Sequence, residues 1–425
     1  MAPRAETRRA VIMGQGYVGL PLAMRASEVG YDVVGFDTDE ERIKRLASGE
    51  PQVEDVSEAR LDRALRGGHY LPTTSPDDCA QFDVAVIAVP TPLRDGAPDL
   101  SHIEGAASIL GPHVRTGSTV VLESTTYPGT TEELLVPELE SRSRLEGGRD
   151  FRVGYSPERL DPGNRTWDLV NTPKVVSGID DASTEAVRSF YEEIVDHTVV
   201  VSGPKVAELT KLLENTFRHV NIALVNELAM FAHDLDIDVW EAIEAASTKP
   251  HGFMPFVPGP GVGGHCLPVD PSYLSWQVRR ELGQSFRFVE LANDVNAGMP
   301  DYVVRRLIVA LNSRGRAVNG SRLLLLGLSY KENTGDGRES PGLRVAELLL
   351  ELGAEVRAAD PHVEDRWIDP RVVRVDFSPL EVEAVDAVVV LTAHDAFDYA
   401  SVASQAPLVL DMRHCVPAGQ TVEHL

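Results

Sequence analysis

The sequence predicts an α/β protein in which two Rossmann-like doubly wound parallel sheets are joined by a long central helix in an all-α middle region. Three observations lead to this prediction. A strand, a glycine-rich turn, a helix and a second strand follow one another near the start of the chain, and a similar order returns near its end. Between the two lies a helical pattern of about thirty residues, which is longer than an ordinary globular helix.

The composition is that of a globular protein with a strong acidic excess. The chain holds 65 acidic and 40 basic residues, so its formal net charge is -25. This balance argues against nucleic acid and anionic membranes as partners, because both require a basic surface. A chain of 425 residues is also too long for one core, so two or three domains are expected.

Cysteine usage and the N-terminal sequence favour a cytoplasmic protein. The three cysteines are widely spaced and form no CxxC pair, which fits a reducing compartment and predicts no structural metal site. Cys79 precedes a strand in an apolar setting and is expected to serve packing, and Cys415 is expected to be inert. The N-terminus lacks an apolar signal core, and no apolar stretch is long enough to span a bilayer.

The first motif predicts a dinucleotide site. A β-branched run at 10–13 leads into Gly14-x-Gly16-x-x-Gly19, a helix follows, and the next strand ends at Asp37, 18 residues beyond the last glycine. In this setting backbone can approach a pyrophosphate at the helix N-terminus. Asp37 would bind the adenosine ribose and repel a 2′-phosphate, which favours NAD over NADP. The alternative is a glycine turn without a cofactor.

Small polar residues follow the next two buried strands, which are expected within 82–93 and 118–126. They are Thr91 after the first strand, and Ser124, Thr125 and Thr126 after the second. Ligands bind at the carboxyl ends of strands in open α/β sheets. A turn-forming role for these residues is an equally good interpretation.

The middle segment predicts the long helix and two of its faces. An apolar stripe at spacings of three and four residues is expected to be buried: Leu209, Leu212, Leu213, Phe217, Val220 and Leu224. Lys211, Asn215 and Arg218 fall on another face, which periodicity alone would assign to solvent. A helix of this length suits a connector between domains or a dimer interface.

The last part of the chain predicts a second Rossmann-like unit without the glycine fingerprint. A strand, a loop, a helix and a strand ending at Asp360 follow in order, and further strands are expected within 386–394 and 406–413. The first loop carries Lys331, Asp336 and Arg338 where the glycines would stand. Such charges are either surface residues or a ligand site at a strand's carboxyl end.

Four segments resemble a known family in sequence and in order. They are GQGYVGLPLA (14–23), AELTKLLENTFRHVNIALVNE (207–227), GPGVGGHCLPVDP (259–271) and GLSYKENTGDGRESP (327–341). Together they are similar to the UDP-glucose/GDP-mannose dehydrogenase family over nearly the whole chain. The resemblance implies an N-terminal NAD-binding domain at 1–203, a central helical dimerisation and catalytic segment at 204–312, and a C-terminal UDP-sugar-binding domain at 313–425.

Two segments are similar to the branch that acts on UDP-N-acetylhexosamines, notably the UDP-N-acetylglucosamine 6-dehydrogenases. They are YSPERLDPGN (155–164) and HGFMPFVPGPGVGGHC (251–266). The UDP-glucose branch typically has PEFL where this chain has PERL at 157–160. It also tends to have Ser and Lys where this chain has His265 and Val269. UDP-N-acetylglucosamine or its mannosamine epimer is therefore the expected substrate, with UDP-glucose as the alternative.

The resemblance implies a four-electron oxidation of a sugar C6 alcohol to a carboxylate with two NAD. A thiolate converts the aldehyde into a thiohemiacetal, which yields a hydride and a thioester that water hydrolyses. Thiolate formation needs positive surroundings; the resemblance puts Lys211 at the site, and His265 is adjacent to the cysteine in sequence, with its role left open. The implied catalytic residues are Cys266 as nucleophile, Lys211 and Asn215 at the C6 oxygen, and Asp270, Glu158 and Thr125 for the hydrolytic water.

The resemblance also implies two sets of binding residues, no metal, and a homodimer or higher homo-oligomer built on the long helix. The cofactor-binding residues are Gly14, Gly16, Tyr17, Val18, Gly19, Asp37, Arg42, Pro90, Thr91, Ser124, Thr125 and Lys331. The substrate-binding residues are Glu158, Arg159, Leu160, Lys211, Asn215, Arg218, Phe256, Pro258, Gly259, Gly263, Tyr330, Lys331 and Arg338.

Two other functions remain as alternatives. A two-electron hydroxyacid-type dehydrogenase would use Lys211 and Asn215 and leave Cys266 incidental. A non-enzymatic NAD-binding regulator would use the thiol only as a redox sensor. The yield of NADH per substrate separates the three hypotheses, because they predict two, one and none.

Overall fold

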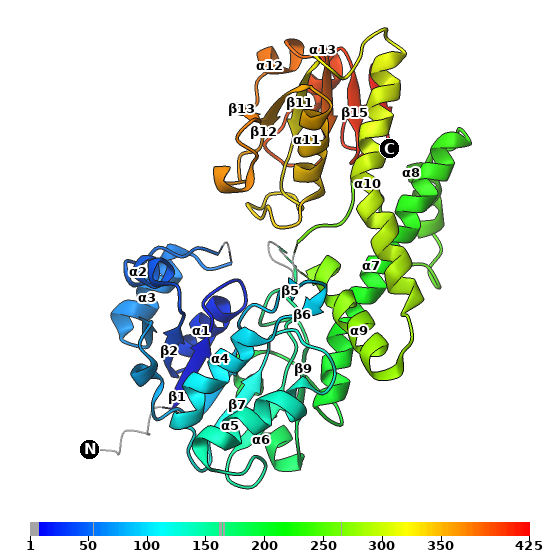
Figure 1. The fold of residues 1–425 in the computed structure, drawn as a ribbon. Coiled ribbons are helices and arrows are strands. Elements are labelled where there is room, and N and C mark those ends of the chain that lie inside the picture. The colour runs from blue at the N-terminus through cyan, green and yellow to red at the C-terminus, as the bar shows by residue number, and fades with distance from the viewer. Residues whose placement is uncertain (1–7, 54, 161–163, 165, 265) are drawn as a thin grey trace. The chain divides into compact units, whose positions relative to one another are not determined.

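The structure is a computed structural model that describes the whole chain except residues 1–7, 54, 161–163, 165 and 265 and the side chain of Cys266. The chain folds into two compact units, Met1–Glu214 and Asn215–Leu425. Each unit is built around one large sheet with helices on both faces (Figure 1). The predicted α/β class with two Rossmann-like sheets and a long central helix is confirmed.

The first unit contains an eight-stranded sheet with the order β10-β9-β8-β7-β4-β1-β2-β3. Its strands are β1 (Arg9–Met13), β2 (Asp32–Phe36), β3 (Tyr70–Thr73), β4 (Val84–Ile87), β7 (Thr119–Leu122), β8 (Arg152–Tyr155), β9 (Lys174–Gly178) and β10 (Thr198–Val200). All neighbours pair in parallel except β8 and β9, which are antiparallel. The last two strands therefore run against the other six, a departure from the predicted parallel sheet. A small ribbon of β5 (Leu93–Arg94) and β6 (Ala97–Pro98) stands apart.

Helices cover both faces of this sheet because successive side chains of each strand point to opposite sides. The helices are α1 (Gly19–Glu28), α2 (Glu40–Ala47), α3 (Glu58–Gly67), α4 (Ser101–Leu110), α5 (Val136–Ser143) and α6 (Asp181–Ile194). Ile12 of β1 packs in one core with residues of α1 and α6, and Met13 packs in the other with residues of α4 and α5.

The sheet has a topological switch point beside β1. Strand β1 pairs with β2 on one side and with β4 on the other, so the chain leaves in both directions from this strand. Ligands bind outside the carboxyl ends of strands at such a point. The loops that begin at Gly14, Asp37 and Ala88 all start at this edge, directly after β1, β2 and β4.

The second unit contains a six-stranded parallel sheet with the order β13-β12-β11-β14-β15-β16. Its strands are β11 (Arg322–Leu326), β12 (Glu355–Ala359), β13 (Val373–Arg374), β14 (Ala387–Val390), β15 (Val409–Asp411) and β16 (Val422–His424). The helices α11 (Pro341–Glu351) and α10 (Arg287–Asn312) share one core with alternate residues of β11, and α12 (Pro379–Glu383) and α13 (Tyr399–Gln405) share the other.

The long helix α7 (Pro204–Asp234) has 31 residues, as the sequence predicts, but its apolar stripe is not buried within the chain. Leu212 is 0% exposed, whereas Leu213 is 62% and Leu224 is 52% exposed. Leu209 and Phe217 are also exposed, and further apolar residues extend the stripe: Leu228, Phe231 and Leu235. The prediction of a buried stripe is therefore wrong for the single chain, because periodicity identifies an apolar face but not what covers it.

Two shorter helices complete the central part of the chain, α8 (Val239–Ser247) and α9 (Cys266–Leu282). Among the described residues, no helix combines the length and the apolar character that crossing a membrane requires.

The loop after β11 is fixed by one buried carboxylate. Asp360 follows β12, and its Oδ2 accepts hydrogen bonds from Leu328 N at 2.6 Å and from His394 Nε2 at 3.1 Å. Its Oδ1 accepts from His362 N at 2.8 Å and from Val363 N at 2.9 Å. Burial alone would raise the pKa of Asp360, but the hydrogen bonds from His394 and the backbone outweigh it and hold the pKa well below its usual range.

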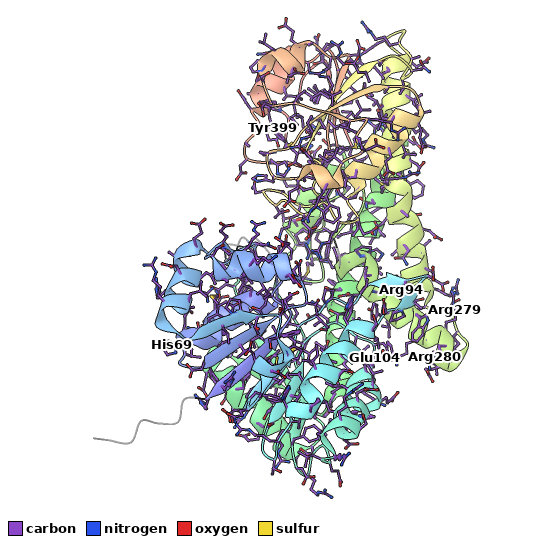
Figure 2. The ribbon with its side chains drawn as sticks, turned by 60° about the vertical axis from the view of Figure 1, so that its left-hand side comes forward. His69, Arg94, Glu104, Arg279, Arg280 and Tyr399 are labelled. Atoms are coloured by element: carbon purple, nitrogen blue, oxygen red, sulfur yellow. The ribbon has the colours of Figure 1, made fainter. Side chains whose placement is uncertain are left out.

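His394 is itself locked in this arrangement. The residue is fully buried, and its Nδ1 accepts a hydrogen bond from Asn333 N at 2.9 Å, which leaves Nε2 to donate to Asp360. Its carbonyl oxygen accepts from the hydroxyl of Tyr399 at 2.9 Å, at the start of α13 (Figure 2). The charged carboxylate thus organises the carboxyl edge of the second sheet.

We predict that Asp360→Asn destabilises the second unit by about 2–3 kcal/mol, since an amide NH2 would face backbone donors and leave them unpaired. Because the folded-state pKa is depressed, the stabilisation is present above the unfolded pKa of about 3.9 and is lost as the pH falls. Urea unfolding at neutral pH measures the change. Asp398→Asn is the control, because Asp398 caps α13 and Asn caps a helix equally well. Equal stability of the two variants would contradict the role assigned to Asp360.

Candidate active site

The loop after β1 has the geometry of a phosphate-binding turn. Gly14 has a φ of +91°, and a Cβ there would lie 2.4 Å from the carbonyl oxygen of Ala88. A Cβ on Gly19 would lie 1.8 Å from the carbonyl oxygen of Gly14, so the first and third glycines are required by the fold. A Cβ on Gly16 would meet open space. Packing therefore does not explain why a glycine stands at position 16, and the absence of a side chain leaves the backbone accessible to a ligand.

The helix behind this loop begins at the same edge without a side-chain cap. Val18 is the N-cap of α1 and supplies no side-chain cap, and Tyr17 beside it is half-buried. A helix N-terminus carries a partial positive charge, which suits a pyrophosphate. The turn thus fits the dinucleotide that the sequence predicts.

Asp37, which the sequence predicts to bind the ribose, directly follows β2. It is 7% exposed, and its Oδ2 accepts hydrogen bonds from Gln15 N at 2.8 Å and from Arg42 Nη1 at 2.9 Å. Its Oδ1 accepts from Asp39 N at 3.0 Å. The acid is therefore tied directly to the glycine loop. Arg42, predicted to bind the cofactor, is the ion-pair partner of this acid.

The predicted polar residues after β4 and β7 play different parts. The hydroxyl of Ser124 donates to Val89 O at 2.8 Å and accepts from Val89 N at 2.9 Å, so it joins the two strand ends. Thr91 is buried and Pro90 is exposed. Thr125 is half-buried, whereas the neighbouring Thr126 is fully buried.

Thr126 is among the polar residues that the sequence predicts after this strand, but it is not among the implied site residues. Its buried hydroxyl has no hydrogen-bond partner among the described residues, although buried hydroxyls are normally paired. The sequence offers two adjacent threonines at the end of a strand and does not show which one is turned inward. An unpaired hydroxyl at the carboxyl edge of the sheet is available to a ligand or a water.

Glu158 and Lys211 lie together in the first unit. The Nζ of Lys211 on α7 donates a hydrogen bond to the carbonyl oxygen of Glu158. Lys211 is only 6% exposed, so the assignment of its helix face to solvent is wrong at this position. Arg218, on the same predicted face, is exposed and fits the solvent assignment.

Arg159 and Leu160 are held beside Glu158. Arg159 pairs with Glu214 at 2.7 Å and also donates to the carbonyl oxygen of Pro173. The backbone N–H of Leu160 donates to the Oε1 of Glu158. The segment that distinguishes this chain from PEFL sequences is therefore anchored by polar contacts.

A second pair of predicted residues lies together in the second unit. The amide of Asn215 donates to the Oδ2 of Asp270 at 2.5 Å, and Asp270 is 1% exposed. Asp270 lies one turn after Cys266, the first residue of α9. Arg279 and Arg280 lie in the last turn of this helix (Figure 2), so its charged end is the one far from Cys266. The side chain of Cys266 and the whole of His265 lie outside the described part of the chain.

The glycine-rich loop before α9 packs against the loop after β11. A Cβ on Gly263 would lie 2.6 Å from the Cβ of Tyr330, and one on Gly264 would lie 2.8 Å from the ring of the same tyrosine. Gly264 N donates to the carbonyl oxygen of Arg338 at 2.9 Å. These two glycines are thus explained by packing, whereas the family resemblance implies a substrate contact for Gly263.

The start of the same loop is hydrogen-bonded to Asn226 and packs against Arg413. Gly259 N donates to the Oδ1 of Asn226 at 2.9 Å, and a Cβ on Gly259 would lie 2.7 Å from an Nη of Arg413. Pro258 is buried, and the half-buried Phe256 packs edge-on against Phe217 with ring centroids 5.8 Å apart. Arg413 was not singled out from the sequence, because a lone arginine after a short strand carries no local signal.

The charged loop of the second unit is partly neutralised internally. Arg338 pairs with Asp336, with Nη2 and Oδ2 2.5 Å apart. Lys331 and Tyr330 are half-buried in the same loop. Asp360 stands in the place that Asp37 holds in the first unit, but it is saturated by backbone donors and His394.

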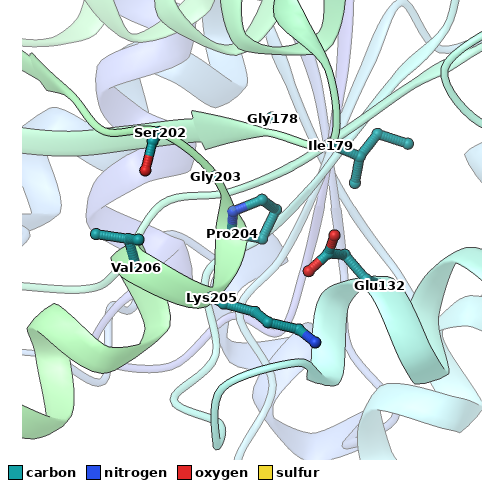
Figure 3. A pocket seen from close by; sticks show the side chains of 8 residues that line it. All are labelled: Glu132, Gly178, Ile179, Ser202, Gly203, Pro204, Lys205 and Val206. Carbon is teal, nitrogen blue, oxygen red and sulfur yellow. The ribbon is translucent and has the colours of Figure 1, made fainter.

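A surface pocket of about 240 Å³ lies in the first unit (Figure 3). It is lined by Glu132, Gly178, Ile179, Ser202, Gly203, Pro204, Lys205 and Val206. None of the predicted site residues lines it, and the described residues hold no cluster of metal-ligating side chains.

Glu123 and Lys174 are two further residues that the sequence analysis missed. They form a buried ion pair next to Glu158. Each is a charged residue at the end of an otherwise apolar strand segment, and this pattern is the sequence feature that could have identified them. Their separation of 51 residues hid the pairing.

Three family models cover most of the chain. The NAD binding domain of the UDP-glucose/GDP-mannose dehydrogenase family matches residues 8–195, the central domain of that family matches 205–298, and its UDP binding domain matches 324–418.

Relatives of known name match over almost their full length. UDP-N-acetyl-D-mannosamine dehydrogenase from Pyrococcus horikoshii is 36% identical over 390 residues, which cover 92% of this chain and 90% of the relative. UDP-N-acetyl-D-glucosamine 6-dehydrogenase from Salmonella typhi is 36% identical over 424 residues, covering 96% and 97%.

Solved structures agree with these matches. The Pyrococcus horikoshii UDP-D-ManNAc dehydrogenase superposes with a TM-score of 0.88 at 34% identity and covers 98% of both chains. A UDP-glucose dehydrogenase from Pyrobaculum islandicum gives 0.87 at 29% identity, covering 100% of this chain and 98% of that one. With an NAD-binding turn, a UDP binding domain and relatives of this kind, the chain is an NAD-dependent nucleotide-sugar dehydrogenase and belongs to the UDP-glucose/GDP-mannose dehydrogenase family.

Proposed function

We propose that the protein oxidises the C6 alcohol of a UDP-N-acetylhexosamine to the uronate through a thioester on Cys266. The observation that carries the proposal is the contact between Asn215 and Asp270, one turn after Cys266 at the start of α9. The contact supports the proposal because both residues belong to the expected machinery and Asp270 follows Cys266 by four positions on α9. The buried contact between Lys211 and Glu158 supports the proposal from the first unit.

In the proposed reaction, bound NAD accepts the hydride at each oxidation. Lys211 and Asn215 bind the C6 oxygen. As the alcohol is oxidised to an aldehyde, Lys211 exchanges the proton of the C6 hydroxyl or stabilises the negative charge on its oxygen. A lysine this far buried has few waters to compete for its ammonium, so its contact with a substrate oxygen is strong.

Cys266 then attacks the aldehyde carbon. The start of α9 favours the thiolate, because a helix N-terminus carries partial positive charge. The C–S bond forms a thiohemiacetal, and loss of the second hydride leaves a thioester. Water adds to the thioester carbon, one of its protons passes to a carboxylate, and the sulfur leaves with the electron pair of the C–S bond. Glu158 and Asp270 are the carboxylates proposed for this step, with Thr125 near the reacting centre.

UDP-N-acetylglucosamine or UDP-N-acetylmannosamine is the proposed substrate. The segment YSPERLDPGN supports the assignment from sequence, and the named relatives of similar length act on these two sugars. Arg159, Leu160, Phe256, Pro258, Gly259, Gly263, Tyr330, Lys331, Arg338 and the exposed Arg218 are the proposed substrate contacts. UDP-glucose is the alternative, supported by the similar fold of a UDP-glucose dehydrogenase.

We further propose that the protein works as a homodimer or higher homo-oligomer in the cytoplasm, with the domain boundaries that the sequence suggests. The exposed apolar stripe of α7 supports the dimer, because a continuous apolar surface of this kind normally marks an interface. The dispersed cysteines support the compartment. The proposed uronate product would serve polysaccharide synthesis.

We predict that NAD is strongly preferred over NADP, because Asp37 would face the 2′-phosphate. Comparison of kcat/KM for the two cofactors measures the preference, and Asp37→Asn should narrow it. The substitution Asp39→Asn is the control, because Asp39 is exposed and caps α2. Equal kcat/KM values for NAD and NADP in the wild type would contradict the assignment of Asp37.

We predict that UDP-N-acetylglucosamine or UDP-N-acetylmannosamine exceeds UDP-glucose in kcat/KM by at least about tenfold, the discrimination that one pocket contact provides. NADH formation across a panel of UDP- and GDP-sugars measures this. Fastest turnover of UDP-glucose would show that the YSPERLDPGN segment does not mark an acetamido sugar.

We predict that Cys266→Ala binds substrate and NAD nearly normally but loses uronate formation by several orders of magnitude, as expected for loss of a covalent nucleophile. The first oxidation does not need the thiol and should continue at a reduced rate. Uronate is measured by mass spectrometry, together with NADH yield, which should be two per substrate in the wild type. Cys415→Ala is the control. Near-normal uronate from Cys266→Ala would overturn the proposed mechanism.

A further inference from the structure

A buried ion pair lies behind Glu158 in the first unit. Lys174 is the first residue of β9 and is 3% exposed, and Glu123 directly follows β7 and is 1% exposed. The Nζ of Lys174 donates to the Oε1 of Glu123, and the hydroxyl of Tyr191 on α6 donates to the Oε2 of Glu123 at 2.9 Å. Both oxygens of this carboxylate are therefore occupied.

Lys174 also reaches the segment that carries Glu158. Its Nζ donates to the carbonyl oxygen of Pro157 at 3.1 Å and lies 4.0 Å from the Oε2 of Glu158. That Oε2 is buried and accepts no hydrogen bond from the described residues. Lys211 binds the next carbonyl oxygen, that of Glu158. Two buried ammonium groups thus hold successive carbonyls of the Pro157–Glu158 segment.

The sheet topology explains how Lys174 comes to this place. Strand β9 is antiparallel to β8, with Gly154 opposite Gly178 and Tyr155 opposite Ser177. Continuing the same register beyond the end of β8 sets Glu158 opposite Lys174. A parallel β9 would begin at the other edge of the sheet, away from Glu158.

Stability alone does not account for the pair. Burial raises the pKa of Glu123 and the nearby Lys174 opposes that change, so the carboxylate depends on the lysine. A buried ion pair seldom stabilises a fold more than well-packed apolar residues of similar volume would. An apolar residue at position 174 could fill the space but could not donate to Pro157 or face Glu158 with a positive charge.

A small hollow lies beside the two side chains. It is lined by Glu158, Arg159, Leu160, Leu169, Thr172, Pro173 and Lys174. Its volume of about 10 Å³ matches the space that one water needs. The free Oε2 of Glu158 would have room for a water without displacing a side chain.

We propose that Lys174, held in place by Glu123, is a positioning residue that orients the Glu158 carboxylate for hydrolysis of the thioester. The inference rests on the proposed function. In this step the water oxygen bonds to the thioester carbon, one water proton passes to Glu158, and the C–S bond breaks with its electron pair leaving on sulfur. Lys174 fixes the backbone that carries Glu158 and sets a positive charge 4.0 Å from the Oε2 of its carboxylate, while Lys211 remains at the C6 oxygen.

The decisive variant is the double substitution Glu123→Gln/Lys174→Met. Lys174→Met alone would leave Glu123 buried without its cation and is expected to be strongly destabilised. In the double variant the amide oxygen of the introduced glutamine would still accept from Tyr191, and the methionine would fill most of the lysine volume. Tyr191→Phe is the matched control, because it removes a contact of Glu123 but leaves Lys174 and Pro157 in contact. Glu158→Gln is the reference for failed hydrolysis.

The experiment follows NADH formation after rapid mixing with NAD and UDP-N-acetylhexosamine, and weighs the intact protein during turnover. The double variant should unfold in urea close to the wild-type midpoint and release two NADH per site in a first phase at a near-normal rate. Its steady-state kcat should then fall at least about tenfold with KM falling in parallel, because hydrolysis becomes limiting. An acyl adduct should accumulate on the protein, as in Glu158→Gln, whereas Tyr191→Phe should show none.

Three results would overturn the inference. Wild-type turnover without adduct in the double variant would mean that the pair is only structural. An equal adduct in Tyr191→Phe would mean that any disturbance of the cluster slows hydrolysis. Normal turnover of Glu158→Gln would remove Glu158 from the step, and the thioester route would still stand if Cys266→Ala forms no uronate. Uronate formed by Cys266→Ala as well would mean that the proposed function itself has failed.

Discussion

Lys174, Lys211 and Asp360 carry charges into places where less than a tenth of each residue is exposed. An unpaired charge is so unfavourable there that the fold must supply partners. The lysines donate hydrogen bonds to the carbonyl oxygens of Pro157 and Glu158. The aspartate accepts hydrogen bonds from backbone N–H groups that follow the carboxyl ends of β11 and β12. Loops at the carboxyl ends of the strands, where apolar packing is thin, are therefore fixed by buried charge. The placement of the candidate site residues depends on this constraint.

An aspartate after the second strand has a different role in each of the two units. Asp37 and Asp360 both follow the second strand of a strand–helix–strand unit. Beside Asp37 the glycine loop leaves open space at Gly16, so a ribose and a diphosphate can approach. Around Asp360 the loop closes on the carboxylate, and His394 completes the enclosure. A ligand of the second unit would then need other groups for recognition, as proposed for Lys331, and a shared topology alone does not assign a ligand.

Local information in the sequence was enough for the strands on either side of the Gly14 and Lys331 loops, the length of α7 and the position of Asp37, because each depends on spacing along a short segment. The exposed stripe of α7 was not predictable, since periodicity shows that Leu213 and Leu224 share a face but not what covers it. Which of Thr125 and Thr126 has a buried hydroxyl depends on how the chain turns after β7, and the local sequence does not show this. Glu123 and Lys174 pair only because the sheet brings distant strand ends together.

The single antiparallel step in the first sheet connects these points. A parallel sheet gathers only the carboxyl ends of its strands at the ligand edge, so the first residue of a strand cannot contribute there. Reversal of β9 brings its first residue, Lys174, to that edge and opposite Glu158. The lysine must then enter a buried position, and Glu123 at the end of β7 supplies the counter-charge within the same layer. The departure from the predicted parallel sheet is thus the feature that allows a cation to be placed behind the carboxylate.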